Sequence, residues 1–419
     1  MKVIVLTPNY PRREAMNNGI FIHQQVKALR ALGVDCQVLL THNWFPSFGL
    51  HRLHPYWRLG YEQKSSYITN YEGVPIHHVP VFVKMPSRFF RENHYEREAS
   101  AIINYIRQTK LLHDAEWLYA HFLTDYGYIG SLVKKKLDIK LAAIARGDDV
   151  HAWPERNPSL VKNLQVVCRE ADILLANSKR LSEDLRTWFE SDFERNVSVI
   201  YNGVDFDRFR PVEDDIEKKE LQKKWGLPSG YKFLICVATP VILKGWIELM
   251  DAIKNLGEDF SGWKLIAVTT PRNGADALDI NKEAKKRGIG QHVIWLGSID
   301  PIHMPDCYRA IDAFILPSHN EGMSNAVVEA LASGLPVVTT DVGGHREFID
   351  SDVNGFLIQP NHTDELIAAL EKIIGDEKFR KDIASYAREG ALRIGSYSQN
   401  AKLLLKLFEV YRSNPVVDK

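Results

Sequence analysis

The chain has 419 residues, of which 45% are hydrophobic and 25% charged, and its 53 basic and 53 acidic side chains leave a formal net charge of zero. This length suggests two or three globular units, and the composition excludes a mostly disordered or fibrous chain. The balanced charge argues against a dedicated nucleic-acid-binding protein, so we expect no nucleic-acid partner.

The cysteines and the apolar runs indicate the compartment. The four cysteines lie far apart and no C-x-x-C pair occurs, which is typical of reduced core residues rather than of a disulfide or zinc framework. The chain begins with a short strand pattern rather than a signal peptide, and no apolar run is long enough to cross a bilayer. We therefore expect a cytoplasmic protein. Residues 1–200 carry 26 basic and 21 acidic side chains. This excess reflects an anionic acceptor, peripheral contact with the inner face of the plasma membrane, or a chance distribution of surface charge.

Strand and helix patterns alternate along the first half of the chain. Residues 3–6 form an apolar strand pattern, residues 19–32 an amphipathic helix pattern, and residues 35–40 a second strand. Such a unit predicts a parallel sheet. The alternation resumes with strands at 118–120, 141–145, 173–176 and 197–201, and helices at 126–136, 160–170 and 180–189. The aromatic-rich segment from Trp44 to Phe90 has no clear periodicity.

A second alternating series follows a connector at residues 203–230, which is rich in charged residues and proline. The expected strands are 232–238, 263–268, 292–296, 313–316 and 336–339, and the expected helices are 245–256, 275–286, 305–310, 324–333, 363–374, 377–388 and 397–412. We predict an α/β protein with two doubly wound, Rossmann-like domains that face each other across a cleft. The predicted domains are residues 1–205 and 206–395, with residues 396–419 as a helix that packs back toward the first domain.

Two common nucleotide-binding motifs are missing from the sequence. Neither first strand–helix turn contains G-x-G-x-x-G, and no G-x-x-x-x-G-K-[ST] occurs. The missing motifs therefore argue against a nicotinamide dehydrogenase or a P-loop nucleotidase.

Residues 316–338 form the segment richest in chemistry, with a strand end, a glycine loop, a helix and another strand. Gly322 allows close approach of a ligand, and Ser324 and Asn325 can cap the helix. The first amides of this helix, those of Met323, Ser324 and Asn325, favour an anionic group such as phosphate. Glu321 and Glu329 would repel a phosphate, so we expect them to hold hydroxyl groups on either side of it.

These residues resemble a known family. The spacing of Glu321 and Glu329 within P-S-x-x-E-G…E-A-x-A-x-G-x-P-V-V resembles the retaining glycosyltransferases of the GT-B fold, especially glycosyltransferase family 4 (glycosyl transferases group 1). Further similar segments follow in the family's order: Asn18-Gly19-Ile20-Phe21, His121, Arg146-Gly147-Asp148-Asp149-Val150, Val199–Pro211, Lys244-Gly245, Val293–Gly297 and Asp341–Glu347. The resemblance covers most of the chain and is most specific in residues 199–358.

The resemblance implies transfer of a sugar from a nucleotide diphosphate donor, with retention of configuration and without a metal ion or other cofactor. Lys244 is expected to neutralise the diphosphate, Glu321 to orient the donor sugar, and Glu329 to bind the ribose hydroxyls. His121 and Asp148 complete the predicted catalytic set, and the donor phosphate is expected to take the acceptor's proton. The other expected donor-binding residues are Thr239, Leu296, Gly297, Gly322, Met323, Ser324 and Asn325, and the expected acceptor-binding residues are Asn18, Gly19, Arg146 and Asp149.

The sequence departs from the family pattern in two places. Ala238-Thr239 stands where the family usually has Gly-Arg, which weakens the expected diphosphate site unless Arg272 or Lys84 supplies a cation. Arg146 replaces the usual histidine of the H-G-x-D element. It is interpreted either as a contact for an anionic acceptor or as an ion-pair partner of Asp148 or Asp149.

Three further segments have alternative interpretations. The aromatic residues between Trp44 and Tyr61 form either a satellite core or a platform that stacks on sugar rings. The basic stretch Lys84–Arg91 is either a solvated loop or a contact with a membrane that carries a lipid-linked acceptor. Asp205-Phe206-Asp207 matches a D-x-D metal motif but belongs better to the linker signature, so no metal site is predicted.

The predicted function is that of a metal-independent retaining hexosyltransferase. Its expected partners are a nucleotide-sugar donor, with UDP-sugars favoured by their frequency in the family, and a saccharide or lipid-linked saccharide in cell-surface polysaccharide or glycolipid synthesis. The alternatives are a nucleotide-sugar epimerase and a non-catalytic protein that binds a sugar or nucleotide sugar.

Overall fold

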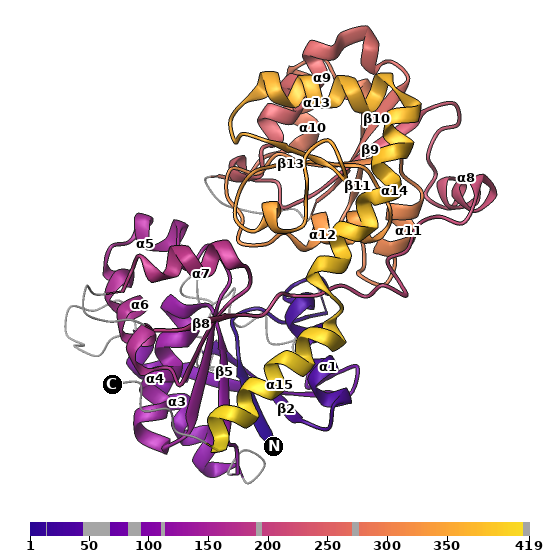
Figure 1. Ribbon diagram of the computed structural model, residues 1–419. Coiled ribbons are helices and arrows are strands. Elements are labelled where there is room, and N and C mark those ends of the chain that lie inside the picture. Colours follow the sequence, from indigo (N-terminus) through magenta and orange to yellow (C-terminus); the bar gives the residue numbers. More distant parts are fainter. Residues whose placement is uncertain are drawn as a thin grey trace, which may run out of the picture. The chain divides into compact units, whose positions relative to one another are not determined.

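The structure is a computed structural model that describes residues 1–13, 15–44, 68–82, 94–109, 114–189, 195–269 and 276–413. The chain divides into two compact units, each built around its own parallel sheet (Figure 1). The first unit comprises Met1–Tyr201 and Ser398–Lys419, and the second comprises Asn202–Tyr397. The predicted aromatic platform beyond Trp44, the basic stretch Lys84–Arg91 and Arg272 lie outside the described residues.

The first unit contains an eight-stranded sheet in the order β3-β4-β2-β1-β5-β6-β7-β8. Its strands are β1 (Lys2–Leu6), β2 (Asp35–Trp44), β3 (Asn70–Tyr71), β4 (Val74–Phe82), β5 (Trp117–His121), β6 (Lys140–Ala145), β7 (Ile173–Ala176) and β8 (Val197–Val199). Only the β3–β4 pair of this sheet is antiparallel. In the parallel part, Val3 of β1 pairs with Cys36 of β2 and Trp117 of β5. Hence these strands all end at the same edge of the sheet.

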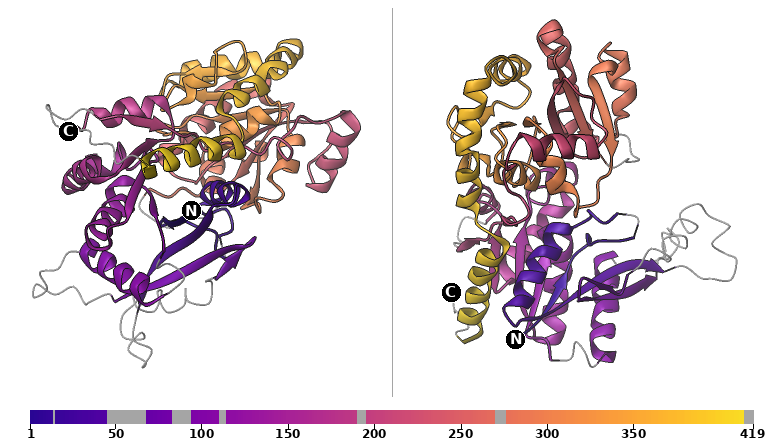
Figure 2. Two further views of the ribbon diagram at one scale, coloured as in Figure 1. Left: turned by 60° about the horizontal axis from the view of Figure 1, so that its bottom comes forward. Right: turned by 90° about the vertical axis from the view of Figure 1, so that its right-hand side faces the viewer.

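Helices cover both faces of this sheet. They are α1 (Ile20–Ala31), α3 (His94–Gln108), the π-helical turn η4 (Leu123–Gly127), α4 (Tyr128–Leu137), α5 (Ala152–Arg156), α6 (Ser159–Glu170), α7 (Lys179–Arg186) and α15 (Tyr397–Ser413). One core joins the sheet to α1 and α15, and the other joins it to α3, α4, α6 and α7. Figure 2 shows α15, in yellow, on the same side as α1. Its Phe408 ring packs 5.0 Å from that of Trp117, so the C-terminal helix completes the core of the first unit.

The second unit contains a six-stranded, fully parallel sheet in the order β11-β10-β9-β12-β13-β14. Its strands are β9 (Lys232–Val237), β10 (Trp263–Val268), β11 (Val293–Gly297), β12 (Ala313–Leu316), β13 (Val337–Thr340) and β14 (Phe356–Ile358). Its helices are α8 (Asp215–Lys224), α9 (Trp246–Leu256), α10 (Ile280–Lys286), α11 (Met304–Arg309), α12 (Asn325–Ala332), α13 (Thr363–Gly375) and α14 (Glu377–Ile394). The 3₁₀ turns are η5 (Ile242–Lys244), η6 (Gly257–Phe260), η7 (Gly290–His292) and η8 (His345–Glu347). Helix α12 packs against α14, and α13 packs against α9.

The predicted α/β class with parallel sheets is confirmed, and most predicted strands agree with the structure to within two residues. The segment between residues 44 and 90 shows no clear periodicity in the sequence, yet β3 and β4 lie there, and neither strand was predicted. Two prolines and adjacent histidines interrupt the strand pattern of β4. Among the described residues, β4 pairs on its outer side only with the short β3. Among the described residues, no helix has both the length and the apolar character needed to span a bilayer.

Candidate functional site

The site in the second unit lies at the edge where its parallel strands end. The loops that follow β9, β12 and β13 carry Thr239–Gly245, Pro317–Ser324 and Asp341–Glu347. This edge is the usual ligand site of an open parallel sheet. The fold therefore brings together the three second-unit segments in which the sequence placed its main candidates.

Lys244 and Glu321 form an ion pair at this edge. The Nζ atom of Lys244 lies 2.8 Å from Oε1 of Glu321, which also accepts a 2.8 Å hydrogen bond from the Ser318 hydroxyl. Burial alone would raise the pKa of the Glu321 carboxyl, but the ammonium of Lys244 holds it below its ordinary value. Glu321 is therefore an anion at neutral pH, and Lys244 is a cation held in a fixed place.

Close backbone packing joins these loops. Gly245 has φ +70°, and a Cβ atom there would lie 1.9 Å from the carbonyl oxygen of Pro317. Gly343 has φ +53°, and its Cβ would lie 2.2 Å from the carbonyl oxygen of Glu321. The amide of His319 also donates to the carbonyl of Leu243 at 2.9 Å. The ion pair is thus built on backbone contacts that only glycine permits.

Helix α12 begins beside Glu321. Ser324 occupies the N-cap position, but its side chain makes no cap hydrogen bond, so the expected side-chain cap was wrong. Asn325 instead accepts a 2.7 Å hydrogen bond on Oδ1 from the Nδ2 group of Asn202. The first amides of a helix have no partner within it, and they lie at its positive end. This helix start, with Gly322 and Met323 before it, therefore suits an anionic group.

Glu329 lies one turn into α12, next to α11. The hydroxyl of Tyr308 donates to Oε2 of Glu329 at 3.2 Å. Burial raises the pKa of Glu329 to about 7, against the opposing effects of this hydrogen bond and of Arg208. The carboxyl group therefore changes charge near neutral pH, although it remains able to accept hydrogen bonds from hydroxyl groups.

Replacing Glu329 by glutamine is expected to stabilise the protein at alkaline pH. The folded pKa of about 7 exceeds the ordinary value of 4.5, so the stability that the protonated group contributes is complete below pH 4.5 and is lost as pH rises to 7. At pH 8 Glu329→Gln should raise the free energy of unfolding by about 1–3 kcal/mol, with little change at pH 4.5. Urea denaturation at both pH values, with the exposed Glu371→Gln as control, measures this. An equal effect of Glu329→Gln at both pH values would contradict it.

The remaining donor-binding candidates lie at the same edge. Thr239 is exposed just after β9, and its carbonyl oxygen accepts a 3.0 Å hydrogen bond from the Trp246 indole. Leu296 and Gly297 end β11 at the side of the sheet, where the Gly297 carbonyl accepts from the amide of Thr269 at 3.0 Å. The structure therefore places all of these candidates on strand ends of one sheet.

Sequence reasoning missed three side chains that shape this site. Ser318 and Tyr308 hold the two carboxylates, as described above. His345 is fully buried, and Nδ1 donates to the carbonyl of Thr340 at 2.8 Å. Burial lowers the pKa of His345 despite the nearby Glu321, so the ring is neutral. Ser318 could have been predicted from its place in the P-S-x-x-E motif. The hydrogen bond from Tyr308 to Glu329 could not, because it depends on tertiary packing.

In the first unit, the ends of β5 and β6 bring His121 and Arg146 together. The Arg146 guanidinium donates to Nδ1 of His121 from Nη2 at 2.7 Å and from Nε at 3.3 Å. It also donates to Oε1 of Gln25 on α1 at 3.2 Å and lies over the Phe21 ring. Its described side-chain hydrogen bonds thus go to a histidine and a glutamine, while Asp149 accepts from the backbone amide of Arg146. Both interpretations of Arg146, a contact for an anionic acceptor and a pairing with Asp148 or Asp149, stay predictions.

The neighbouring carboxylates differ in environment. Asp149 is fully buried and accepts three backbone amides, those of Leu123, Arg146 and Gly147, at 2.7–2.9 Å. Its carboxylate therefore fastens the loop after β6 to the start of η4. Asp148 is exposed, and its backbone carbonyl accepts the amide of Trp153.

The loop before α1 carries the last two candidates. Gly19 caps α1 with φ +64°, and a Cβ there would lie 2.3 Å from the carbonyl oxygen of Asn9. Asn18 donates to the carbonyl of Tyr10 at 3.3 Å. Both residues therefore pack the end of the loop before α1 against its beginning, at Asn9 and Tyr10.

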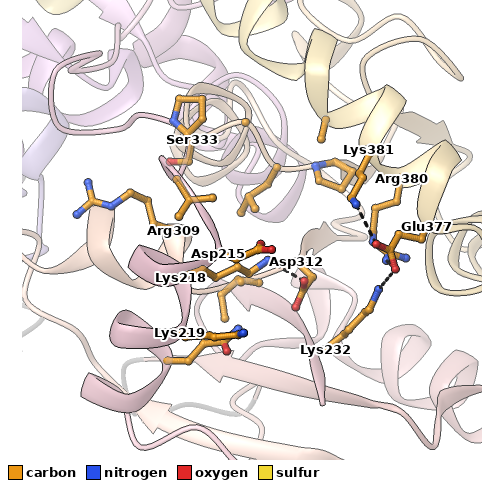
Figure 3. A pocket seen from close by; sticks show the side chains of 18 of the residues that line it. Asp215, Lys218, Lys219, Lys232, Arg309, Asp312, Ser333, Glu377, Arg380 and Lys381 are labelled. Carbon is orange, nitrogen blue, oxygen red and sulfur yellow. Dashed lines mark hydrogen bonds and ion pairs between the residues drawn. The ribbon is translucent and has the colours of Figure 1, made fainter. Parts of the chain in front are cut away.

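A hollow of about 490 Å³ lies at the opposite edge of the second sheet, where strands begin (Figure 3). Its charged side chains pair largely with one another: Glu377 with Lys232 and Lys381, and Asp312 with Lys218. This hollow is separate from the edge that carries Lys244 and Glu321.

Two parallel-sheet units with candidate sites at their strand ends define the GT-B class, and solved structures share this fold. Sucrose-phosphate synthase from Thermosynechococcus elongatus matches with a TM-score of 0.78 and 16% identity, covering 99% of this chain and 100% of that one. Anabaena Alr3699/HepE in complex with UDP-glucose matches with a TM-score of 0.74 and 18% identity, covering 98% and 100%.

Sequence comparisons identify the family. The family model described as Glycosyl transferases group 1 matches residues 217–390, and that described as Glycosyltransferase Family 4 matches residues 19–208. TuaC of Bacillus subtilis (strain 168), a glycosyltransferase named for teichuronic acid biosynthesis, is 27% identical over 409 residues, covering 96% of this chain and 97% of TuaC. The chain belongs to the group 1, family 4 glycosyltransferases.

Proposed function

We propose that the protein transfers a hexose from a nucleotide diphosphate sugar to a saccharide or lipid-linked saccharide. The donor is a UDP-sugar, the anomeric configuration is retained, and no metal ion takes part. The transfer serves the synthesis of a cell-surface polysaccharide or glycolipid on the cytoplasmic side of the membrane.

The arrangement of Lys244, Glu321 and the start of α12 carries this proposal. The ammonium of Lys244 and the first amides of α12 offer positive charge to a diphosphate. Their stabilising effect increases during the reaction, because negative charge accumulates on the departing diphosphate. Glu321 and Glu329 lie on either side of the helix start and accept hydrogen bonds from hydroxyl groups. Glu321 therefore suits the sugar and Glu329 the ribose.

The compared proteins support the chemistry of donor and acceptor. Alr3699/HepE has the same fold and was solved with UDP-glucose. TuaC is named for the synthesis of teichuronic acid. A UDP-sugar donor and an anionic polysaccharide are therefore the first candidates to test.

A melting-temperature screen tests the donor. UDP, GDP, ADP, TDP and their common sugars are added at millimolar concentration, and a ligand present at 100 times its Kd stabilises the folded state by about 2.7 kcal/mol. We expect UDP and one or more UDP-sugars to raise the melting temperature by about 5 °C or more, because unfolding of units of this size responds by 2–4 °C per kcal/mol. EDTA should leave the shift and the transfer rate unchanged. No shift with any nucleotide would contradict the proposed donor site.

A further inference from the structure

The contact between Arg146 and His121 lies inside a buried polar cluster of the first unit. His121 is fully buried, Arg146 is 8% exposed and Gln25 is 1% exposed. The Tyr119 hydroxyl donates to Oε1 of Gln25 at 2.9 Å, and the guanidinium of Arg146 donates to the same oxygen. The orientation of the Gln25 amide is thus fixed by two donors on its oxygen.

This contact determines which nitrogen of His121 carries hydrogen. Arginine has only donors and stays charged, so the Nδ1 atom that receives the hydrogen bonds at 2.7 and 3.3 Å must offer its lone pair. The neutral ring then carries its hydrogen on Nε2. Burial and the charge of Arg146 both lower the pKa of His121 well below its ordinary value, which agrees with a neutral ring.

The cluster also leaves buried N–H groups without partners. Nε2 of His121 and Nε2 of Gln25 have no hydrogen-bond partner within the described part of the chain. Buried polar groups are nearly always hydrogen-bonded in folded proteins, and exceptions point to a functional role or a bound molecule. Both atoms are donors, so a group that satisfies either of them presents an acceptor such as oxygen.

We propose that Arg146 is a positioning residue that fixes His121 as the neutral Nε2–H tautomer, so that His121 binds a substrate oxygen as a donor and does not act as the base. The identity of that oxygen, a hydroxyl or carboxylate of a saccharide, rests on the proposed function. The tautomer itself does not.

The proposal has a consequence for the proton in the transfer step. The acceptor's O–H bond breaks as its oxygen bonds to the anomeric carbon, and the bond from that carbon to the diphosphate oxygen breaks. Nε2 of His121 already carries hydrogen and Nδ1 is occupied, so neither atom can take the released proton. The proton must therefore go to a group other than His121. In the proposed function that group is the diphosphate leaving group, and the hydrogen bond from Nε2 remains throughout the step.

Nuclear magnetic resonance of the histidine ring nitrogens tests the tautomer without any turnover. In ¹⁵N-histidine-labelled full-length protein, the signals that disappear in His121→Gln belong to His121. We expect the Nε2–H tautomer in the wild type, a mixture of tautomers in Arg146→Met, and the wild-type pattern in Arg146→Lys, which keeps a charged donor. The exposed Arg186→Met serves as a control for loss of an arginine from the same unit. An Nδ1–H tautomer in the wild type, or no change in Arg146→Met, would overturn the proposal.

Activity of His121 variants separates a donor from a base. A glutamine side chain can place its N–H group near the position of Nε2 but cannot take a proton, whereas alanine offers neither. We expect His121→Gln to keep a rate within about tenfold of the wild type and His121→Ala to lose about 100-fold or more, the scale of a lost transition-state donor. Equal losses in both variants would identify His121 as a base. If no donor supports transfer at all, the proposed function fails while the resonance experiment still decides the role of Arg146.

Discussion

Replacing Lys244 by alanine should lower the rate of sugar transfer at least ~100-fold, as expected for loss of a cation that stabilises a developing leaving-group charge. The ammonium lies 2.8 Å from Glu321 and beside the start of α12, so it occupies the place where diphosphate charge would gather. Steady-state kinetics with the donor found in the melting screen measures the effect. The loss should appear mainly in kcat, because the charge on the leaving group grows during the reaction.

Two further variants separate the role of Lys244 in catalysis from its role in folding. Lys254→Ala removes an exposed lysine from α9 of the same unit and should leave the rate unchanged. Lys244→Ala leaves the Glu321 carboxylate without its ammonium partner, which costs stability by itself. The double variant Lys244→Ala/Glu321→Gln removes that charge, so it should melt closer to the wild type while remaining inactive. A normal rate in Lys244→Ala would remove Lys244 from the site.

Hydrophobic periodicity predicted the fold where strands and helices have simple patterns. Strand β7 was predicted with its observed bounds, because four apolar residues run between a polar helix end and a serine-containing cap. Helix α3 was missed although Ala99, Ile102, Ile103 and Ile106 form a regular buried stripe, since charged residues precede it. Strand β4 was missed because two prolines and adjacent histidines interrupt its apolar residues, although it pairs with β2 along most of its length.

The site was predictable only as far as it lies in short local motifs. The local sequence around Glu321 and Glu329 predicts a loop followed by a helix start. The ion pair between Lys244 and Glu321, by contrast, joins two distant segments. The hydrogen bonds from Tyr308 to Glu329 and from Arg146 to His121 join residues 21 and 25 positions apart, respectively. Such contacts depend on sheet order and on side-chain packing, which no single segment encodes. The sequence therefore supplied candidate ligands for a substrate but not the residues that orient them.

Replacing Gly245 by alanine should destabilise the second unit by about 3 kcal/mol or more, since strain at a left-handed residue adds to a steric clash. The added Cβ would lie 1.9 Å from the carbonyl oxygen of Pro317, so the backbone of one loop must move. Urea denaturation of the full-length protein measures the loss. The same movement displaces Lys244 from Glu321, so the transfer rate should fall as well.

Gly226→Ala is the matched control for this prediction. Gly226 has φ +64°, close to the +70° of Gly245, but nothing lies within 4 Å of a Cβ built on it. Its replacement should cost only the conformational strain of a left-handed alanine, about 1 kcal/mol. The difference between the two variants isolates the contact between the loops after β9 and β12. Equal losses would mean that this contact relaxes freely, and the ion pair of Lys244 and Glu321 would then not depend on a glycine at its base.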